Sequence, residues 1–193
     1  MKSLFLFMFS FFQVSIGFTQ NIPSKYYGEY KGNLEIFSGG NKHTLEMEFK
    51  LRPTQDPESL DYILIYHSPD QKNIREYVLK YKDSLGNYDL DEQNGIVIPT
   101  KFVNNSLHSF FEVQNHLLKS SIRFFDNHTE FEIVMANTKT IDTTKATKED
   151  IEVLSYPVGA YLINLLDLLN SNLMVILKFQ LVLKVRSGLV LFL

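Results

Sequence analysis

A strict alternation of apolar and charged residues over positions 44–52 constrains the fold more than any other feature. Apolar side chains occupy every second position, namely Leu45, Met47, Phe49 and Leu51. Charged side chains fill the positions between them, namely Glu46, Glu48, Lys50 and Arg52. Because successive side chains of a strand point to opposite faces, this pattern predicts a strand with one face in a core and one in water.

The pair Asn94-Gly95 predicts how such strands are connected. It separates two strand-like runs, residues 88–91 and 96–98. Asn-Gly favours a tight type I′ hairpin turn, because both residues tolerate the positive φ that this turn requires. We expect a Pro- and Asn-rich connection over residues 99–105 to follow this hairpin, and the next strand to begin at Leu107.

Similar short runs continue along the chain and predict an antiparallel meander of about ten strands. No segment before Val158 has the pattern of a helix, residues 137–150 read as a polar loop, and residues 151–156 read as a short strand. A meander must close or stack to bury its apolar face and protect its edges. We therefore predict an all-β fold in which the meander closes into a roughly ten-stranded barrel, with a β-sandwich as the alternative.

The predicted organisation has three parts. Residues 1–19 have one lysine, a Phe/Leu-rich run and then small residues, which is typical of a secretory signal peptide and predicts a secreted or periplasmic protein. Residues 20–157 form the barrel domain. The apolar tail, residues 158–193, leaves three interpretations open: a helix followed by a closing strand, a membrane- or partner-facing appendage, or an extension from a shifted reading frame.

Composition excludes several classes of function. The chain has no cysteine, which removes disulfides, thiolate chemistry and a lipid anchor on cysteine. Its net charge of −3 and the lack of a basic stripe argue against nucleic acid as a partner. The five histidines show no metal-ligand spacing, so we predict no metal site and no cofactor.

The start of the predicted barrel domain carries a family resemblance. Gly28, Tyr30 and Gly32 form a G-x-aromatic-x-G motif. It resembles the G-x-W opening of lipocalin-type (calycin) barrels and the opening of nitrobindin-like haem barrels, and the meander with one long polar loop is similar to fatty-acid-binding proteins. The resemblance covers residues 26–156, with tyrosine in place of tryptophan. It implies an interior ligand site, and we include Tyr30 among the candidate ligand-binding residues. Haem binding is not implied, because the last histidine, His128, lies in a predicted turn.

Arg75 is the charged residue with the most informative position. It shares strand parity with Tyr77, Leu79 and Tyr81, so it points into the barrel if that face lines the interior. A guanidinium and a phenol beside an apolar wall can hold a ligand carboxylate. We therefore predict Arg75 and Tyr77 as ligand-binding residues. The alternative is an ion pair at the barrel rim between Arg75 and Glu76 or Asp70.

The functional prediction is that a lipocalin-like barrel binds a small apolar or anionic amphiphilic ligand. The alternative is a non-catalytic structural or interaction domain whose interior is filled by its own side chains. An enzyme using the carboxylates Asp89 and Asp91, or using Arg75, is a third hypothesis. The shared parity of the two carboxylates, opposite Tyr88 and Leu90, favours a solvent-facing position. Membrane contact through the tail is a further possibility that the sequence leaves open.

Overall fold

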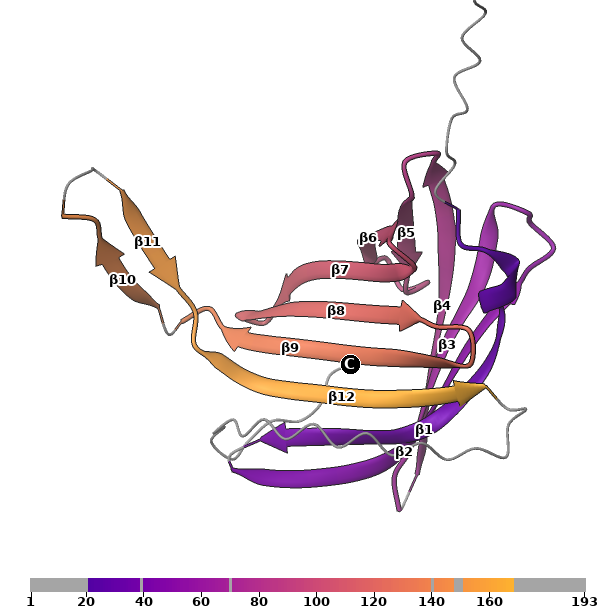
Figure 1. Cartoon of the computed structure of the whole chain (residues 1–193), viewed down its shortest axis with the longest axis horizontal. Coiled ribbons are helices and arrows are strands. Elements are labelled where there is room, and N and C mark those ends of the chain that lie inside the picture. The colour runs from indigo at the N-terminus through magenta and orange to yellow at the C-terminus, as the bar shows by residue number, and fades with distance from the viewer. Residues whose placement is uncertain (1–20, 39, 70, 140, 148–150, 169–193) are drawn as a thin grey trace, which may run out of the picture.

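The computed structural model describes residues 21–38, 40–69, 71–139, 141–147 and 151–168 (Figure 1). The predicted signal peptide and the tail beyond Leu168 lie outside the described residues, as does Asp70. No helix in the described ranges is long and apolar enough to cross a membrane.

Ten strands of the described chain form one antiparallel barrel, which confirms the predicted fold class. They are β1 (Gly28–Ser38), β2 (Asn41–Pro53), β3 (Ser59–His67), β4 (Lys72–Asp83), β5 (Asn87–Asp91), β6 (Val97–Val103), β7 (Ser106–Val113), β8 (His116–Phe124), β9 (His128–Asn137) and β12 (Val158–Leu168). Neighbouring strands pair in chain order from β1 to β9, and β12 closes the ring between β9 and β1. The architecture is compatible with a lipocalin-like barrel.

The segment between β9 and β12 leaves the barrel as a separate two-stranded arm (Figure 1). Its strands are β10 (Asp142–Lys145) and β11 (Glu152–Ser155), and every residue of both strands is exposed. Part of the expected polar loop is thus a strand, and the short strand expected at residues 151–156 lies outside the barrel. The strand that closes the barrel is β12, which begins directly after Pro157 and pairs with β1 and β9.

The alternation that predicted the strands also explains the packing of the barrel wall. In β2 the side chains of Met47, Phe49 and Leu51 are fully buried. The outward positions carry charges that pair across strands, as in the Lys31–Glu46 ion pair at 2.9 Å. Burying an aliphatic or aromatic side chain contributes about 1.5–3 kcal/mol, whereas an exposed ion pair contributes about 0–1 kcal/mol, so the inward face dominates stability.

Two tight turns adopt the predicted geometry, but at positions other than Asn94-Gly95. Asn104-Asn105 and Gln114-Asn115 have positive φ at both residues, and each pair joins adjacent strands as a two-residue loop. The expected type I′ turn at Asn94-Gly95 is wrong. There the loop spans five residues, 92–96, and the positive φ values belong to Gln93 and Gly95.

Side-chain hydrogen bonds explain the wider loop between β5 and β6. The carboxylate of Asp91 accepts a hydrogen bond from the Gln93 amide at 2.8 Å, and the Asn94 side chain accepts one from the Ile96 amide at 2.9 Å. Such bonds to the backbone two residues ahead stabilise turns without requiring positive φ at the asparagine.

The expected connection over residues 99–105 is also corrected, because residues 97–103 form β6. Pro99 lies within this strand and pairs with Asp89 of β5. Proline is tolerated in a strand where its missing N–H faces no neighbour. Here β7 begins to pair with β6 only at Thr100, so the side of Pro99 that faces β7 has no partner strand.

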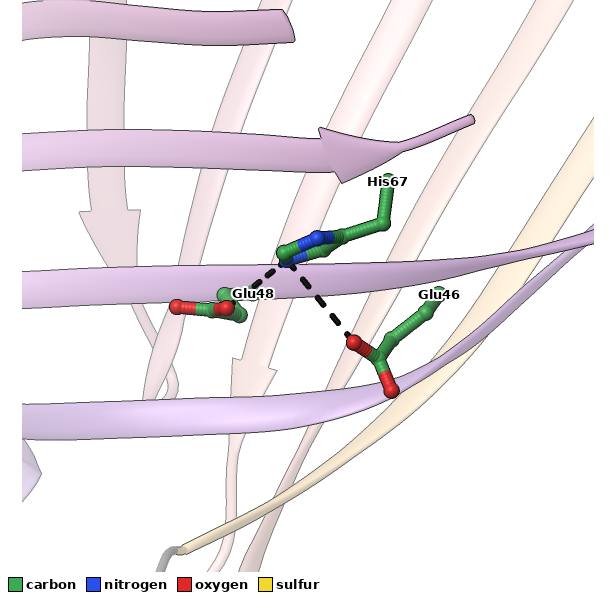
Figure 2. Close-up of side chains that lie close together, drawn as sticks. All are labelled: Glu46, Glu48 and His67. Carbon is green, nitrogen blue, oxygen red and sulfur yellow. Dashed lines mark hydrogen bonds and ion pairs between the residues drawn. The ribbon is translucent and has the colours of Figure 1, made fainter. Parts of the chain in front are cut away.

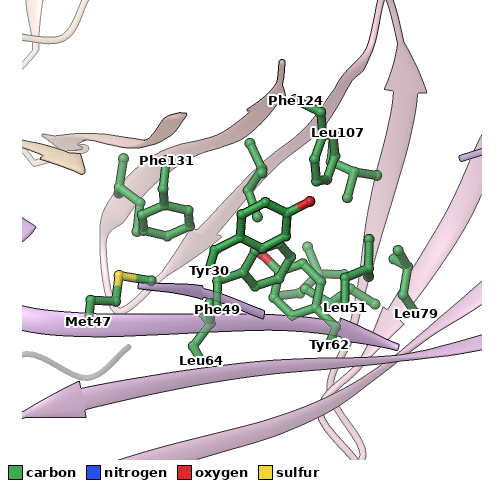
Figure 3. Close-up of a cluster of buried hydrophobic side chains, with 14 of the residues drawn as sticks. Tyr30, Met47, Phe49, Leu51, Tyr62, Leu64, Leu79, Leu107, Phe124 and Phe131 are labelled. Carbon is green, nitrogen blue, oxygen red and sulfur yellow. The ribbon is translucent and has the colours of Figure 1, made fainter. Parts of the chain in front are cut away.

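One end of the barrel, called here the packed end, is filled by aromatic side chains (Figure 3). The ring of Phe49 lies 5.7 Å from that of Tyr30 and 6.5 Å from that of Phe124. A short 3-10 helix, η1 (Ser24–Tyr26), covers this end: Tyr26 stacks on Phe124 at 4.9 Å, and the Ile22 amide donates to the Tyr88 hydroxyl at 3.1 Å. Among the described residues, the interior cavity lies toward the opposite end.

Candidate functional site

A cavity of about 530 Å³ lies in the barrel interior away from the packed end. The β3–β4, β5–β6 and β7–β8 hairpins surround it, and this end of the barrel is called the open end. Most lining side chains are apolar or aromatic, and they include Tyr62, Leu64, Tyr66, Tyr77, Leu90, Ile98, Phe111, Phe131 and Ile133. Ligand cavities in proteins typically have volumes of about 300–1,000 Å³ and apolar walls with a few polar groups.

Arg75 and Tyr77 both lie on the cavity wall, which is where the strand parity places them. In the β3–β4 register Arg75 is opposite Leu64, and Tyr77 is opposite Tyr62. The Nε atom of Arg75 is buried and has no hydrogen-bond partner among the described residues. A buried polar group without a partner costs about 1–3 kcal/mol, so this N–H is a donor available to a ligand.

No described acid forms an ion pair with Arg75. Glu76, one of the two partners considered from the sequence, lies on the opposite face of β4 and is exposed. The carboxylates that line the cavity are Glu92 and Glu112. Glu92 accepts a hydrogen bond from the Asn94 side chain at 3.1 Å, and Glu112 accepts one from the Thr138 hydroxyl at 2.9 Å.

Two phenols flank the guanidinium on the cavity wall. Burial raises the pKa of Tyr77 to about 12, with a smaller contribution from the charge of Glu92, while the charge of Arg75 acts in the opposite direction. Burial also raises the pKa of Tyr66, which lines the same wall. Both phenols are therefore neutral donors at neutral pH, and neither hydroxyl is hydrogen-bonded to a described residue.

Sequence reasoning missed Tyr66 and Glu92 as cavity residues. Tyr66 lies in a run that is apolar on both faces, so parity alone did not distinguish it from its neighbours. Its position two residues beyond Leu64, which faces Arg75, is the signal that could have identified it. Glu92 follows a strand whose inward residues are Tyr88 and Leu90, and extending that parity by one step places it inward.

The structure places Tyr30, the third candidate ligand-binding residue, at the packed end. Its side chain is 1% exposed, and its hydroxyl donates to the Tyr26 carbonyl at 2.7 Å. It does not line the cavity that contains Arg75 and Tyr77. In this position Tyr30 contributes to the core and holds the η1 helix against the barrel.

A second cluster of chemically versatile side chains lies on the outer face of β2 and β3 (Figure 2). His67 Nε2 is 2.7 Å from a Glu48 oxygen and 3.8 Å from a Glu46 oxygen. Sequence spacing did not reveal this group, because the register of β2 and β3 creates it. Both carboxylates also pair with lysines, Glu46 with Lys31 at 2.9 Å and Glu48 with Lys50 at 3.5 Å. The cluster therefore forms part of the ion-pair network on the outer face.

The carboxylates considered for catalysis face solvent. Asp89 pairs with Lys82 at 3.2 Å, and Asp91 pairs with Lys80 at 2.7 Å, both across β4 and β5. Hydrogen bonding to Lys80 and to the Gln93 amide lowers the pKa of Asp91. These groups stabilise the sheet surface and the β5–β6 loop, and they lie on the face opposite Leu90, a cavity residue.

Comparison with protein-family models gives no match, and comparison with curated protein sequences gives none either. The geometry of the cavity is therefore the basis for a functional proposal.

Proposed function

We propose that this protein binds a small amphipathic ligand inside a lipocalin-like barrel. The apolar part of the ligand occupies the 530 Å³ cavity, and an acceptor oxygen of its head group, such as a carboxylate oxygen, lies against Arg75. The observation that carries the proposal is the buried Arg75 Nε without a partner on the wall of an apolar cavity. Tyr66 and Tyr77 add neutral donors beside it.

The charges around the cavity support an amphiphile with one small anionic group. An arginine offers two parallel N–H donors to a carboxylate, and a charge-assisted bond contributes about 1.5–3 kcal/mol. Glu92 and Glu112 oppose additional negative charge, so a ligand with a single carboxylate fits better than one with several. The alternative is a barrel whose interior is filled by its own side chains. The packed end fits this alternative, but the cavity at the open end does not.

Secretion is part of the proposal, and it depends on the expected signal peptide in residues 1–19. A carrier exported without disulfides needs a core that is stable on its own. The aromatic cluster at the packed end provides such a core, and it adjoins the cavity through the contact of Phe49 with Tyr62 at 5.0 Å.

Titration of a fluorescent long-chain fatty acid tests the proposal. We expect saturable binding to the wild-type protein, competed by unlabelled fatty acid and less well by its methyl ester, because the ester lacks the charge that Arg75 recognises. A second test is mass spectrometry of small molecules that co-purify with the protein. Absence of saturable binding by any long-chain amphiphile, charged or neutral, would refute the proposal and favour the non-binding structural domain.

A further inference from the structure

The barrel wall is interrupted between β6 and β7. The two strands pair over only four residue pairs, from Val103–Ser106 to Thr100–Ser109. Beyond Thr100 and Ser109, residues 97–99 pair only with β5 and residues 110–113 pair only with β8, among the described residues. We call the space between these two unpaired edges the side opening.

Pro99 explains why the pairing stops at this point. If the register continued, Pro99 would lie opposite Phe110 as the next hydrogen-bonded pair after Lys101 and His108. Proline has no N–H to donate, so that pair cannot complete its two hydrogen bonds. The side opening is therefore a consequence of the sequence and lies at the same level as the cavity.

The cavity meets a groove on the outer face of the barrel at the side opening. This groove has a volume of about 660 Å³ and is lined by residues of β4 to β8. Pro99 and Ser109 line both the groove and the interior cavity. Thr100 and Tyr88, whose side chains are buried inside the barrel, also line the outer groove, so the groove extends along the backbone of β5 and β6 beside the side opening.

The two edges of the side opening suit an anionic amphiphile. Val97 on one edge and Phe110 on the other are 51% and 65% exposed, so each edge presents a large apolar side chain to solvent. Three lysines line the outer groove. Lys82 pairs with Asp89 and Lys119 pairs with Glu132, whereas Lys101 donates to the Asn87 side chain and forms no ion pair with a described residue. The groove thus offers apolar surface for a chain and positive charge for an anion.

We infer that the ligand reaches the cavity sideways, between β6 and β7, rather than through the open end of the barrel. The lysines of the groove attract the anionic amphiphile, and its apolar chain passes Val97, Pro99 and Phe110 into the interior. Arg75 then holds the head group after the chain has entered. This inference rests on the proposed function, because it concerns the route of the same ligand.

A cross-link across the side opening tests the inference. Val97→Cys and Glu112→Cys place one thiol on each edge, and the chain has no other cysteine, so a short bis-maleimide reacts only there. The probe is a fluorescent long-chain fatty acid, mixed rapidly with the protein before and after cross-linking. We expect the cross-link to slow association by about tenfold or more, because the chain can no longer pass.

A matched control places the same cross-link between two paired strands at the open end. Glu35→Cys and Thr44→Cys lie opposite each other in β1 and β2, away from both the cavity and the groove. We expect this cross-link to leave the association rate unchanged. Phe110→Glu is a second variant that needs no cross-link. It should slow association of the fatty acid more than that of its methyl ester, because it adds negative charge beside the side opening.

The outcomes separate the inference from the proposed function. Equal association rates with and without the Val97–Glu112 cross-link, with binding intact, would overturn the side route and leave the proposed function standing. No saturable binding by the wild-type protein would refute the proposed function and the route together. A slower rate in both the test and the control cross-link would also overturn the inference, because rigidity anywhere in the barrel would explain it.

Discussion

The hydroxyl groups of Thr100 and Ser109 lie 2.8 Å apart at the point where β6 and β7 separate. Both side chains are buried and point into the barrel. This hydrogen bond joins the last residue pair of β6 and β7 before the side opening. Thr100 also contacts the Ile98 carbonyl at 3.2 Å.

The hydrogen bond between the Thr100 and Ser109 hydroxyls should contribute to the stability of the barrel. Thr100→Val leaves the buried Ser109 hydroxyl without a partner among the described residues, and we expect a loss of about 1–2 kcal/mol in the free energy of unfolding. Ser109→Ala should cost less, because the Thr100 hydroxyl keeps its bond to the Ile98 carbonyl. In the Thr100→Val, Ser109→Ala double variant the loss should be smaller than the sum of the two single losses. Urea unfolding of all four proteins measures the coupling. Strict additivity would show that the two hydroxyls do not interact.

Neutralising Glu92 should strengthen the binding of anions. Glu92 lines the cavity that contains Arg75, and its charge repels a ligand carboxylate. For a partly exposed charge this repulsion is about 0.3–1 kcal/mol, so Glu92→Gln should tighten fatty-acid binding by about two- to fivefold. Glu76→Gln, an exposed change on the opposite face of β4, is the matched control and should have no effect. Weaker binding by Glu92→Gln would contradict the charge arrangement proposed for the cavity.

Stability at high pH should report on Tyr77. Its pKa is raised to about 12 in the folded protein, above the unfolded value of about 10. The stability that its neutral form contributes is fully present below pH 10 and is lost as the pH rises through 12. Tyr77→Phe should therefore lose less stability than the wild type between these pH values. Unfolding in urea at several alkaline pH values measures the difference, and parallel pH profiles would show that Tyr77 is not buried as described.

The barrel should depend on β12 for cooperative folding. Its backbone pairs with both β1 and β9, so a chain that ends at Pro157 leaves two long edges unpaired. We expect this chain to lose its cooperative urea transition or to aggregate, whereas a chain that ends at Leu168 keeps every described strand. A cooperative transition with an unchanged midpoint in the shorter chain would show that β12 does not stabilise the barrel.

Much of the barrel could be predicted because a half-buried strand imposes a local pattern. The alternation in β2 and β4 is contained within each strand, and it placed Arg75 and Tyr77 on the inner face before any register was known. The strand β12 lacks this signal, because its residues are apolar on both parities, and a run of that kind does not distinguish a strand from a helix.

The remaining features depend on contacts between distant segments. The loop at Asn94-Gly95 is wide because Asp91 and Asn94 form side-chain hydrogen bonds to the backbone, although the dipeptide itself favours a tighter turn. The cluster of His67 with Glu46 and Glu48 depends on the register of β2 and β3. The side opening depends on whether the backbone of Pro99 faces β5 or β7. The sequence alone does not reveal which neighbouring strand a residue faces.

The central claim is that Arg75 recognises the head group of a ligand inside the barrel. Its most direct test compares the affinities of a fluorescent fatty acid and its methyl ester for the wild type and for Arg75→Met. Arg123→Met is the matched control, because Arg123 lies outside the cavity and pairs with Glu130 at 2.9 Å. A lost charge-assisted bond of about 1.5–3 kcal/mol predicts that Arg75→Met binds the acid about ten- to a hundredfold more weakly, with ester binding almost unchanged. Equal losses for acid and ester, or no loss for either, would contradict the claim.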